Sequence, residues 1–245
     1  MMITVITINK DNITGLKKTI NSIAIQTYKF YKHIIVDGSS RDGSIEYING
    51  LATKGDVTHL YDEGLGIYNA MNIGLMGCSS KYLFYLNSGD VFSSEDSLKI
   101  LAECADGVDV VHGMFGCKRD KVIEYNNQCV EVYFGKRYQH NIPSLASSLI
   151  LREKLLAVKG FNTRYKISSD VEVMYKIALA KGTFRCVQQP IVVFDTNGIS
   201  SKKPIVAIKE RFMILLEVKP TYVIPLMHEI IRYIVKKLKH KIKEP

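Results

Sequence analysis

The 245-residue sequence lacks several features that would assign it to a class at once. It contains no run of about 18 uncharged apolar residues, so a membrane-spanning helix is not expected. No basic segment precedes the first predicted strand, so a secretory signal is not expected either. No Gly-x-Gly follows that strand, which argues against a dinucleotide-binding dehydrogenase or a methyltransferase.

Cysteine is scarce, and its spacing does not suggest metal binding. The cysteines are odd in number, and no two of them form a C-x-x-C pair. Neither a disulfide framework nor a zinc site is indicated, and we expect buried, reduced thiols in a cytosolic protein. They are Cys78, Cys104, Cys117, Cys129 and Cys186.

The composition is that of a globular protein, with 47% hydrophobic and 23% charged residues. The length suits one large α/β domain, with or without an appendage. The formal net charge is +9, yet no recognised nucleic-acid-binding motif accompanies it, so no nucleic-acid partner is expected.

Much of the positive charge lies after residue 231, where basic and apolar residues interleave at helical spacing. This pattern is typical of an amphipathic helix on an anionic membrane surface, here the inner face of the plasma membrane. The alternative is a solvated helix that packs on its own domain. The basic residues are Arg232, Lys236, Lys237, Lys239, Lys241 and Lys243, and the apolar residues are Ile230, Ile231, Ile234, Val235 and Leu238.

Short β-branched segments alternate with amphipathic stretches in the first half of the chain. Strands are predicted at 2–8, 33–36, 57–61 and 82–86. Helices are predicted across about 14–26, 45–51, 67–76 and 95–104. This order requires a mostly parallel sheet with right-handed crossovers, so the predicted fold class is α/β.

The second half of the chain is less regular. Strands are predicted at 108–115, 122–126, 145–151 and 184–194, the last of them interrupted by Pro190. Helices are predicted at 154–158 and 168–180, and the chain is helical and basic from Pro204.

Each of the first four predicted strands ends on polar residues, namely Asn9, Asp37, Asp62 and the pair Asn87 and Asp90. In an open parallel sheet, ligands bind in the crevice outside the carboxyl ends of the strands. The pattern therefore predicts a polar ligand along this rim, and a metal-bound nucleotide fits it well.

Three carboxylates suggest specific chemistry, each with a simpler alternative. Asp37 can accept hydrogen bonds from a flat ligand edge such as the N3–H of uracil, or it caps a turn. Asp90 can ligate a divalent cation shared with a diphosphate, or it caps a helix. Asp170, at a predicted helix start, can act as a general base that deprotonates an acceptor hydroxyl, or it is only an N-cap.

Together, these segments resemble family 2 glycosyltransferases of the GT-A fold. The resemblance is carried by Asn9, I-V-D-G-S-S-R-D-G-S at 35–44, D-E-G-L-G-I-Y-N-A-M-N-I-G at 62–74, L-N-S-G-D at 86–90 and S-S-D at 168–170. The sequence is most similar to bacterial enzymes that build O-antigen, capsule or colanic-acid repeat units. The resemblance covers about residues 2–195.

The resemblance implies an organisation of the chain. A GT-A domain would span residues 1–203, with a Rossmann-like nucleotide-sugar half of mostly parallel sheet at 1–105 and a mixed acceptor half at 106–203. The basic amphipathic helical tail would span 204–245.

The resemblance also implies roles for individual residues. Asp37 would hold the uracil base of the nucleotide, and Asp90 would ligate Mn²⁺ or Mg²⁺ on the diphosphate. Asp170 would be the general base of an inverting transfer, with Glu172 as the next candidate for that role. The nucleotide-sugar pocket would be lined by Thr7, Asn9, Asp62, Asn87 and the segment 66–72, where Asn69 and Asn72 are the polar candidates.

Three departures from the family pattern matter. Asn87, Ser88 and Gly89 leave Asp90 alone where relatives often carry two or three aspartates. Ser169 replaces a frequent glutamate before Asp170, and Ser144–Ser148 lacks a frequent His-Gln pair.

The expected enzyme moves a sugar from a UDP-sugar to a saccharide acceptor linked to a lipid diphosphate, in bacterial surface polysaccharide synthesis. A nucleotidyltransferase is an alternative, but residues 9–12 lack the glycine-rich basic loop that it would need. A catalytically inactive binding module of the same fold is the other alternative.

Overall fold

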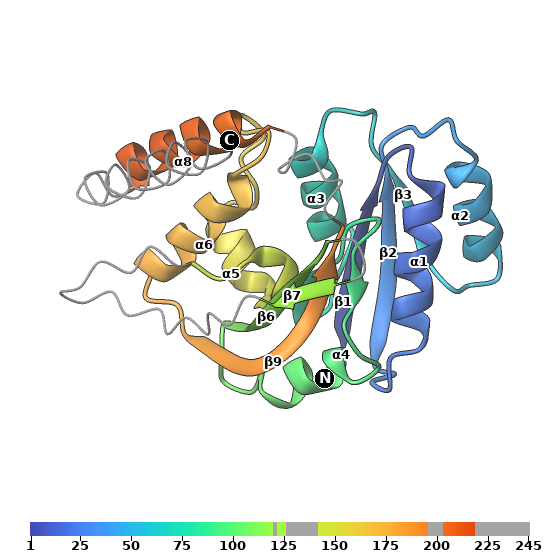
Figure 1. The fold of residues 1–245 in the computed structure, drawn as a ribbon, viewed down its shortest axis with the longest axis horizontal. Helices are drawn as coiled ribbons and strands as arrows, with labels where there is room; N and C mark the ends of the chain where they lie inside the picture. The colour runs from blue at the N-terminus through green and yellow to red at the C-terminus, as the bar shows by residue number, and fades with distance from the viewer. Residues whose placement is uncertain (120–121, 126–141, 196–202, 219–245) are drawn as a thin grey trace, which may run out of the picture.

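The computed structural model describes residues 1–119, 122–125, 142–195 and 203–218. In this part of the chain, nine strands form one sheet in the order β3-β2-β1-β4-β8-β6-β9-β5, with β7 paired to β6. Helices lie on both sides of the sheet (Figure 1). This arrangement confirms the predicted α/β class.

The first half of the chain forms the parallel part of the sheet. β2 pairs with β1 and β3, and β1 also pairs with β4, always in parallel. The strands are β1 (Ile3–Asn9), β2 (Tyr31–Asp37), β3 (Thr58–Tyr61) and β4 (Tyr82–Tyr85), and the helices are α1 (Ile13–Ala24), α2 (Ser44–Thr53), α3 (Ile67–Met76) and α4 (Ser97–Glu103).

The strand register brings the polar strand ends together. Asn9 pairs with Asp37, which in turn pairs with the last residue of β3. The backbone N–H of Asp62 donates to the carbonyl oxygen of Asp37 at 2.8 Å, and that of Ser88 donates to Ile8 at 3.0 Å. The carboxyl ends of the four strands therefore form one continuous rim, as the sequence predicted.

The second half of the chain extends the sheet with mixed pairing. β8 is antiparallel to β4 and β6, whereas β6 and β9 are parallel. The strands are β5 (Val91–Phe92), β6 (Val110–Arg119), β7 (Val122–Tyr125), β8 (Ser148–Leu151) and β9 (Phe184–Phe194), and the helices are η1 (Leu145–Ser147), α5 (Arg152–Ala157), α6 (Ser169–Leu179) and α8 (Pro204–Val218).

Two local predictions for this half are wrong, and one short strand was not predicted. Pro190 does not interrupt β9, because it lies opposite Met114 at a register shift, where a missing N–H is tolerated. Residues 145–147 form the 3-10 turn η1 instead of the start of a strand. The sequence did not predict β5, since two residues are too few to show a period.

Successive side chains of the parallel strands point to opposite faces of the sheet, so a hydrophobic core lies on each face. Ile6 and Ile8 of β1 pack with α3 residues such as Met71 and Leu75. Ile35, on the opposite face of β2, packs with α1 and α2. Figure 1 shows the result, with α3 on one side of these strands and α1 and α2 on the other. The first turn of α3 thereby lies at the carboxyl rim.

Helix α8 joins the core that also contains α3 and α6. Ile214 and Leu215 are 0% and 2% exposed and belong to the same core cluster as α6 residues. Its beginning is exposed and apolar, with Ile205 81% exposed. In the part of the chain that the structure describes, no helix combines the length and apolarity needed to cross a membrane. The basic residues after 231 lie outside the described residues.

The cysteines differ in part from the expectation. Cys78, Cys104 and Cys117 are free thiols, as predicted, but only Cys78 is also buried. Cys186 is disulfide-bonded, so the expectation of reduced thiols is wrong for that residue.

Candidate active site

Asn9 and Asp37 form the most buried part of the rim, at 1% and 0% exposure. Asp37 Oδ2 accepts hydrogen bonds from Asn9 Nδ2 at 2.7 Å and from the Ser40 hydroxyl at 2.8 Å, and Oδ1 accepts from the Ser40 N–H at 2.8 Å. Asp37 therefore shapes the turn after β2, the simpler role that the sequence left open. Asn9 Oδ1 is buried and meets no donor among the described residues, a state that buried polar atoms rarely show.

Asp62 shapes the loop that leads into α3. It is 3% exposed, and its Oδ1 accepts from Asn69 Nδ2 while Oδ2 accepts from the Gly64 N–H at 3.1 Å. Gly64 and Gly66 have φ of 78° and 116°, a region that side chains disfavour, which explains the two glycines in D-E-G-L-G. Asp62 and Asn69, both predicted site residues, are thus brought together.

Tyr68 connects this loop to the predicted base. Its hydroxyl donates to Asp170 Oδ1 at 2.9 Å, although the two residues are 102 positions apart in the chain. Burial raises the pKa of Asp170, and the hydrogen bond from Tyr68 and the charge of Arg211 oppose that rise. Burial and the neighbouring Asp170 carboxylate raise the pKa of Tyr68, so its hydroxyl stays protonated and donates.

Asp90, the predicted metal ligand, faces a second aspartate. Its Oδ1 accepts a hydrogen bond from the Asp195 N–H at 2.9 Å. Asp195 Oδ2 lies only 3.0 Å from the position that a Cβ on Gly89 would occupy. Burial raises the pKa of Asp90 to about 7, an effect that the Asp195 carboxylate reinforces and the Asp195 N–H opposes.

These groups fit a hard divalent cation. Such cations prefer carboxylate oxygens and share their remaining coordination with phosphate and water. A cation beside Asp90 would relieve the unfavourable burial of its charge. Throughout the described ranges, no three His, Cys, Asp or Glu side chains cluster as a complete metal site, so other ligands would come from the substrate or water. Asn87 Oδ1 is also buried without a donor among those residues.

Thr7 and Asn72, two other predicted site residues, are engaged within the protein. Thr7 is 0% exposed, and its hydroxyl lies 2.9 Å from His33 Nε2. Burial lowers the pKa of His33 to about 3, which keeps this imidazole neutral. Asn72 donates from Nδ2 to the Phe161 carbonyl at 2.7 Å and accepts from the Phe161 N–H at 2.8 Å.

Glu172, the alternative base, is poorly suited to the role. It is 3% exposed, and its Oε1 forms an ion pair with Lys176 Nζ at 2.9 Å. The Glu172 carboxylate is thus engaged with a lysine of its own helix, whereas Asp170 faces Tyr68 of α3.

Several residues of the site were missed by the sequence reasoning. Ser40 and Tyr68 lie inside the quoted motifs, but only the fold reveals their partners. Asp195 directly follows β9, so the rule of polar strand ends would have found it. Lys10 follows Asn9, and its Nζ lies 3.0 Å from the position of a Cβ on Gly64. Lys10 therefore adds a positive charge beside the rim.

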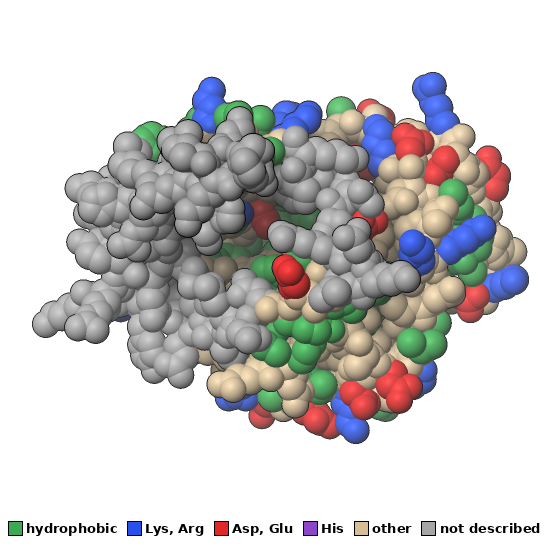
Figure 2. Space-filling model, viewed as in Figure 1, with side chains coloured by type: hydrophobic (Ala, Val, Ile, Leu, Met, Phe, Trp, Pro, Cys, Tyr) green, Lys and Arg blue, Asp and Glu red, His purple; other side chains and the backbone are tan. Residues whose placement is uncertain are grey.

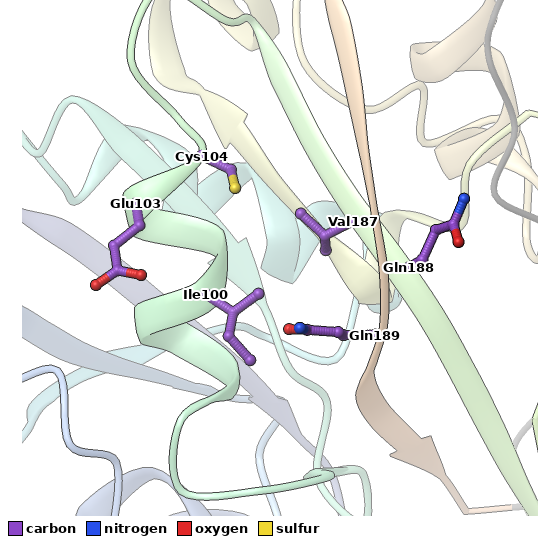
Figure 3. Close-up of a pocket in the computed structure, with 6 residues that line it drawn as sticks. All are labelled: Ile100, Glu103, Cys104, Val187, Gln188 and Gln189. Atoms are coloured by element: carbon purple, nitrogen blue, oxygen red, sulfur yellow. The ribbon is translucent and has the colours of Figure 1, made fainter.

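Two other features of the described surface differ in character from this site. Figure 2 shows Lys and Arg side chains spread over this face among Asp and Glu, without one continuous basic patch in the coloured part. A cavity between α4 and β9 contains none of the predicted site residues (Figure 3). It is lined by Ile100, Glu103, Cys104, Val187, Gln188 and Gln189.

Comparison with known proteins decides the family. The model described as glycosyl transferase family 2 matches residues 3–162. The chain belongs to this family. It is therefore a glycosyltransferase, and both the recognised resemblance and the predicted enzyme class are confirmed.

Curated relatives agree with this assignment. An uncharacterised glycosyltransferase of Mycobacterium tuberculosis is 28% identical over 212 residues, which cover 82% of this chain and 78% of the relative. An uncharacterised glycosyltransferase of Rickettsia conorii is 28% identical over 102 residues, which cover 40% of this chain and 17% of the relative.

Solved structures show the fold. TarS of S. aureus, residues 1–349 in complex with UDP-GlcNAc, has a TM-score of 0.74 and 16% identity, covering 89% of this chain and 66% of that chain. The mannosyltransferase PcManGT of Pyrobaculum calidifontis, in complex with GDP-Man and Mn²⁺, has a TM-score of 0.70 and 16% identity, covering 93% and 68%. These similarities confirm the GT-A fold.

Proposed function

We propose that this glycosyltransferase moves a sugar from a UDP-sugar to a lipid-linked saccharide, with inversion, in the synthesis of a bacterial surface polysaccharide. The observation that carries the proposal is the hydrogen bond from Tyr68 to Asp170. It joins the first turn of α3, which follows the nucleotide rim, to a carboxylate at the start of α6 in the acceptor half.

Asp170 is the general base in this proposal. Its carboxylate accepts the proton of the acceptor hydroxyl as that oxygen attacks the anomeric carbon and the bond to the UDP oxygen breaks. Tyr68 holds Oδ1, and Oδ2 would receive the proton of the acceptor. One base and no protein nucleophile suffice for a single displacement, so an α-linked donor gives a β-linked product.

The donor nucleotide is UDP in this proposal. The buried Oδ1 atoms of Asn9 and Asn87 support it, because unpaired acceptors at a rim can receive N–H or O–H donors of a nucleotide. Asp37 organises the turn beside them and would read the base, and Lys10 adds positive charge for phosphates. TarS, which shares the fold, was solved with UDP and with UDP-GlcNAc.

Mn²⁺ or Mg²⁺ would be held by Asp90, with Asp195 beside it. When bound, such a cation neutralises the charge that builds on the departing diphosphate. The chain's own contribution is to keep Asp90, directly before β5, beside Asp195, directly after β9, through the pairing of these two strands. PcManGT, which shares the fold, was solved with Mn²⁺.

Replacing the base tests the mechanism. Asp170→Asn preserves shape and should lower kcat by at least ~10²-fold, the usual size of a general-base contribution, while UDP affinity stays near that of the wild type. Glu172→Gln is the matched control on the same helix and should retain most of the turnover. An α-linked product by NMR would contradict inversion, and a near-normal kcat for Asp170→Asn would contradict the assignment of the base.

Calorimetry tests the nucleotide. UDP should bind more tightly than GDP or CDP, and Asn9→Ala should weaken UDP because an acceptor at the rim is lost. Equal affinities for the three nucleotides would contradict the choice of UDP.

The acceptor and membrane parts of the proposal rest on the sequence after residue 229 and on exposed apolar residues of α8, such as Ile205. About 1 kcal/mol per surface-bound basic residue suffices for reversible attachment to an anionic inner leaflet. Deleting residues 230–245 should abolish sedimentation with anionic liposomes at low salt and spare activity on a soluble acceptor. Unchanged sedimentation would mean that the tail is not the membrane anchor.

A further inference from the structure

One buried carboxylate of helix α8, that of Glu210, binds the backbone of the acceptor half. Glu210 is 8% exposed, and it accepts hydrogen bonds from three consecutive backbone N–H groups. Oε1 accepts from Lys166 at 2.7 Å, and Oε2 accepts from Ile167 and from Ser168, both at 2.9 Å. Charge-assisted bonds of this kind are about twice as strong as neutral ones, so they fix the backbone of 166–168 firmly.

These N–H groups belong to the segment that enters α6. Ser168 is the N-cap residue of that helix, and its side chain makes no capping hydrogen bond. Its hydroxyl instead donates to the Ala207 carbonyl of α8 at 3.4 Å. The beginning of α6 is therefore held from outside, by α8, and Asp170 lies in its first turn. Figure 1 shows α8 running alongside α6.

We propose that Glu210 is a positioning residue for the transfer reaction, so that α8 is a working part of the acceptor side. The inference rests on the proposed role of Asp170 as the base. Glu210 fixes the 166–168 backbone, this backbone sets where α6 begins, and the start of α6 sets the direction of the Asp170 carboxylate. Tyr68 fixes the same carboxylate from the opposite, donor side.

A second contact of α8 provides a matched control. Glu217, farther along the helix, forms an exposed ion pair with Arg164 at 2.6 Å. Glu217→Gln therefore removes a tether between α8 and the acceptor half without touching the N–H groups of 166–168. Exposed pairs contribute little to stability, so this variant should behave like the wild type.

The test compares Glu210→Gln with Glu217→Gln in kcat, UDP affinity and melting temperature. The amide of Glu210→Gln directs an NH₂ group at N–H donors, which should release the segment. A displacement of about 1 Å can reduce the rate by ~10²-fold, and we expect kcat to fall at least ~10-fold while UDP affinity changes less than about 2-fold. Near-normal kcat, or equal losses of kcat and UDP affinity, would overturn the proposal.

A double variant shows whether Glu210 acts through Asp170. In the Asp170→Asn background, Glu210→Gln should have little further effect on kcat, since coupled residues are not additive. Fully additive losses would contradict only the route from Glu210 to Asp170. Full activity of Asp170→Asn would instead contradict the base itself, so the two failures are distinguishable.

A conservative variant covers the case in which Glu210→Gln does not fold. Glu210→Asp keeps the charge on a side chain one methylene shorter, which cannot reach all three N–H groups. Its kcat should lie between those of the wild type and Asp170→Asn, again with UDP affinity preserved. Wild-type kcat in folded Glu210→Asp, with Glu210→Gln unfolded, would show a role in stability alone and overturn the proposal.

Discussion

The side-chain amide of Asn72 hydrogen bonds with both backbone groups of Phe161. It donates to the carbonyl at 2.7 Å and accepts from the N–H at 2.8 Å. This pair ties α3 to the segment after α5. Gly160 has φ of 64°, and a Cβ there would lie 2.5 Å from Asn72 Oδ1, so the approach also requires this glycine.

Asn72→Ala should therefore destabilise the protein. The change leaves an N–H and a carbonyl of the buried Phe161 unpaired, which costs about 1–3 kcal/mol in the free energy of unfolding. Urea denaturation measures the loss. Asn21→Ala on the exposed face of α1 is the control and should change the stability by less than about 0.5 kcal/mol. Equal effects of the two variants would show that the Phe161 contact contributes nothing.

Tyr68→Phe should change the pH dependence of turnover. The Tyr68 hydrogen bond lowers the pKa of Asp170 against the raising effect of burial, so its removal should raise that pKa further. The acid limb of the kcat profile should then move to higher pH, and kcat near neutral pH should fall about 3- to 10-fold, the value of one hydrogen bond.

Tyr85→Phe is the matched control for this experiment. Tyr68 and Tyr85 are both buried, and both contact the Phe161 ring, but the Tyr85 hydroxyl donates to the Met71 carbonyl at 3.2 Å and not to Asp170. The pH profile of Tyr85→Phe should match that of the wild type. Identical shifts in both variants would indicate a general packing effect and contradict the specific link from Tyr68 to Asp170.

The sequence predicted the rim but not the links across it. Asn9, Asp37 and Asp62 were found because strand ends follow directly from hydrophobic patterning, and parallel strands align their ends. The contact of Tyr68 with Asp170 depends on how α3 and α6 pack over a large sequence separation, which no local pattern encodes. For the same reason Thr7, which the motif assigned to the nucleotide pocket, turns out to hydrogen bond with His33.

Asp90 should make divalent-cation binding depend on pH near neutrality. Its pKa is raised to about 7, so a proton competes with the cation below that pH. The rise in melting temperature on adding Mn²⁺ should be larger at pH 8 than at pH 6, and Asp90→Asn should abolish it. An equal rise in melting temperature at both pH values, or one that persists in Asp90→Asn, would exclude Asp90 as the ligand.

Without a bound cation, the raised pKa of Asp90 predicts that its charge destabilises the folded protein at high pH. A folded pKa above the ordinary value means that the folded state binds the proton more tightly, so this contribution to stability is lost as pH rises through about 7. In EDTA, Asp90→Asn should therefore melt at a higher temperature than the wild type at pH 8 but not at pH 4. A lower melting temperature at pH 8 would show that the Asp90 charge is stabilised within the folded protein.

His33 should make the protein less stable in mild acid. Burial lowers its pKa from 6.5 to about 3, so below pH 6.5 the unfolded chain binds a proton that the folded chain does not. The free energy of unfolding should fall by up to about 1.4 kcal/mol per pH unit between those values. His33→Gln cannot bind this proton, so its free energy of unfolding should fall less steeply with decreasing pH, by up to that amount per pH unit. At pH 8 the variant and the wild type should differ in stability only through the packing of the new side chain. His59→Gln is the control, since His59 is partly exposed and the charge of Asp37 opposes the lowering of its pKa, so it should flatten the curve less. Parallel curves for the wild type and His33→Gln would mean that His33 takes up its proton without unfolding.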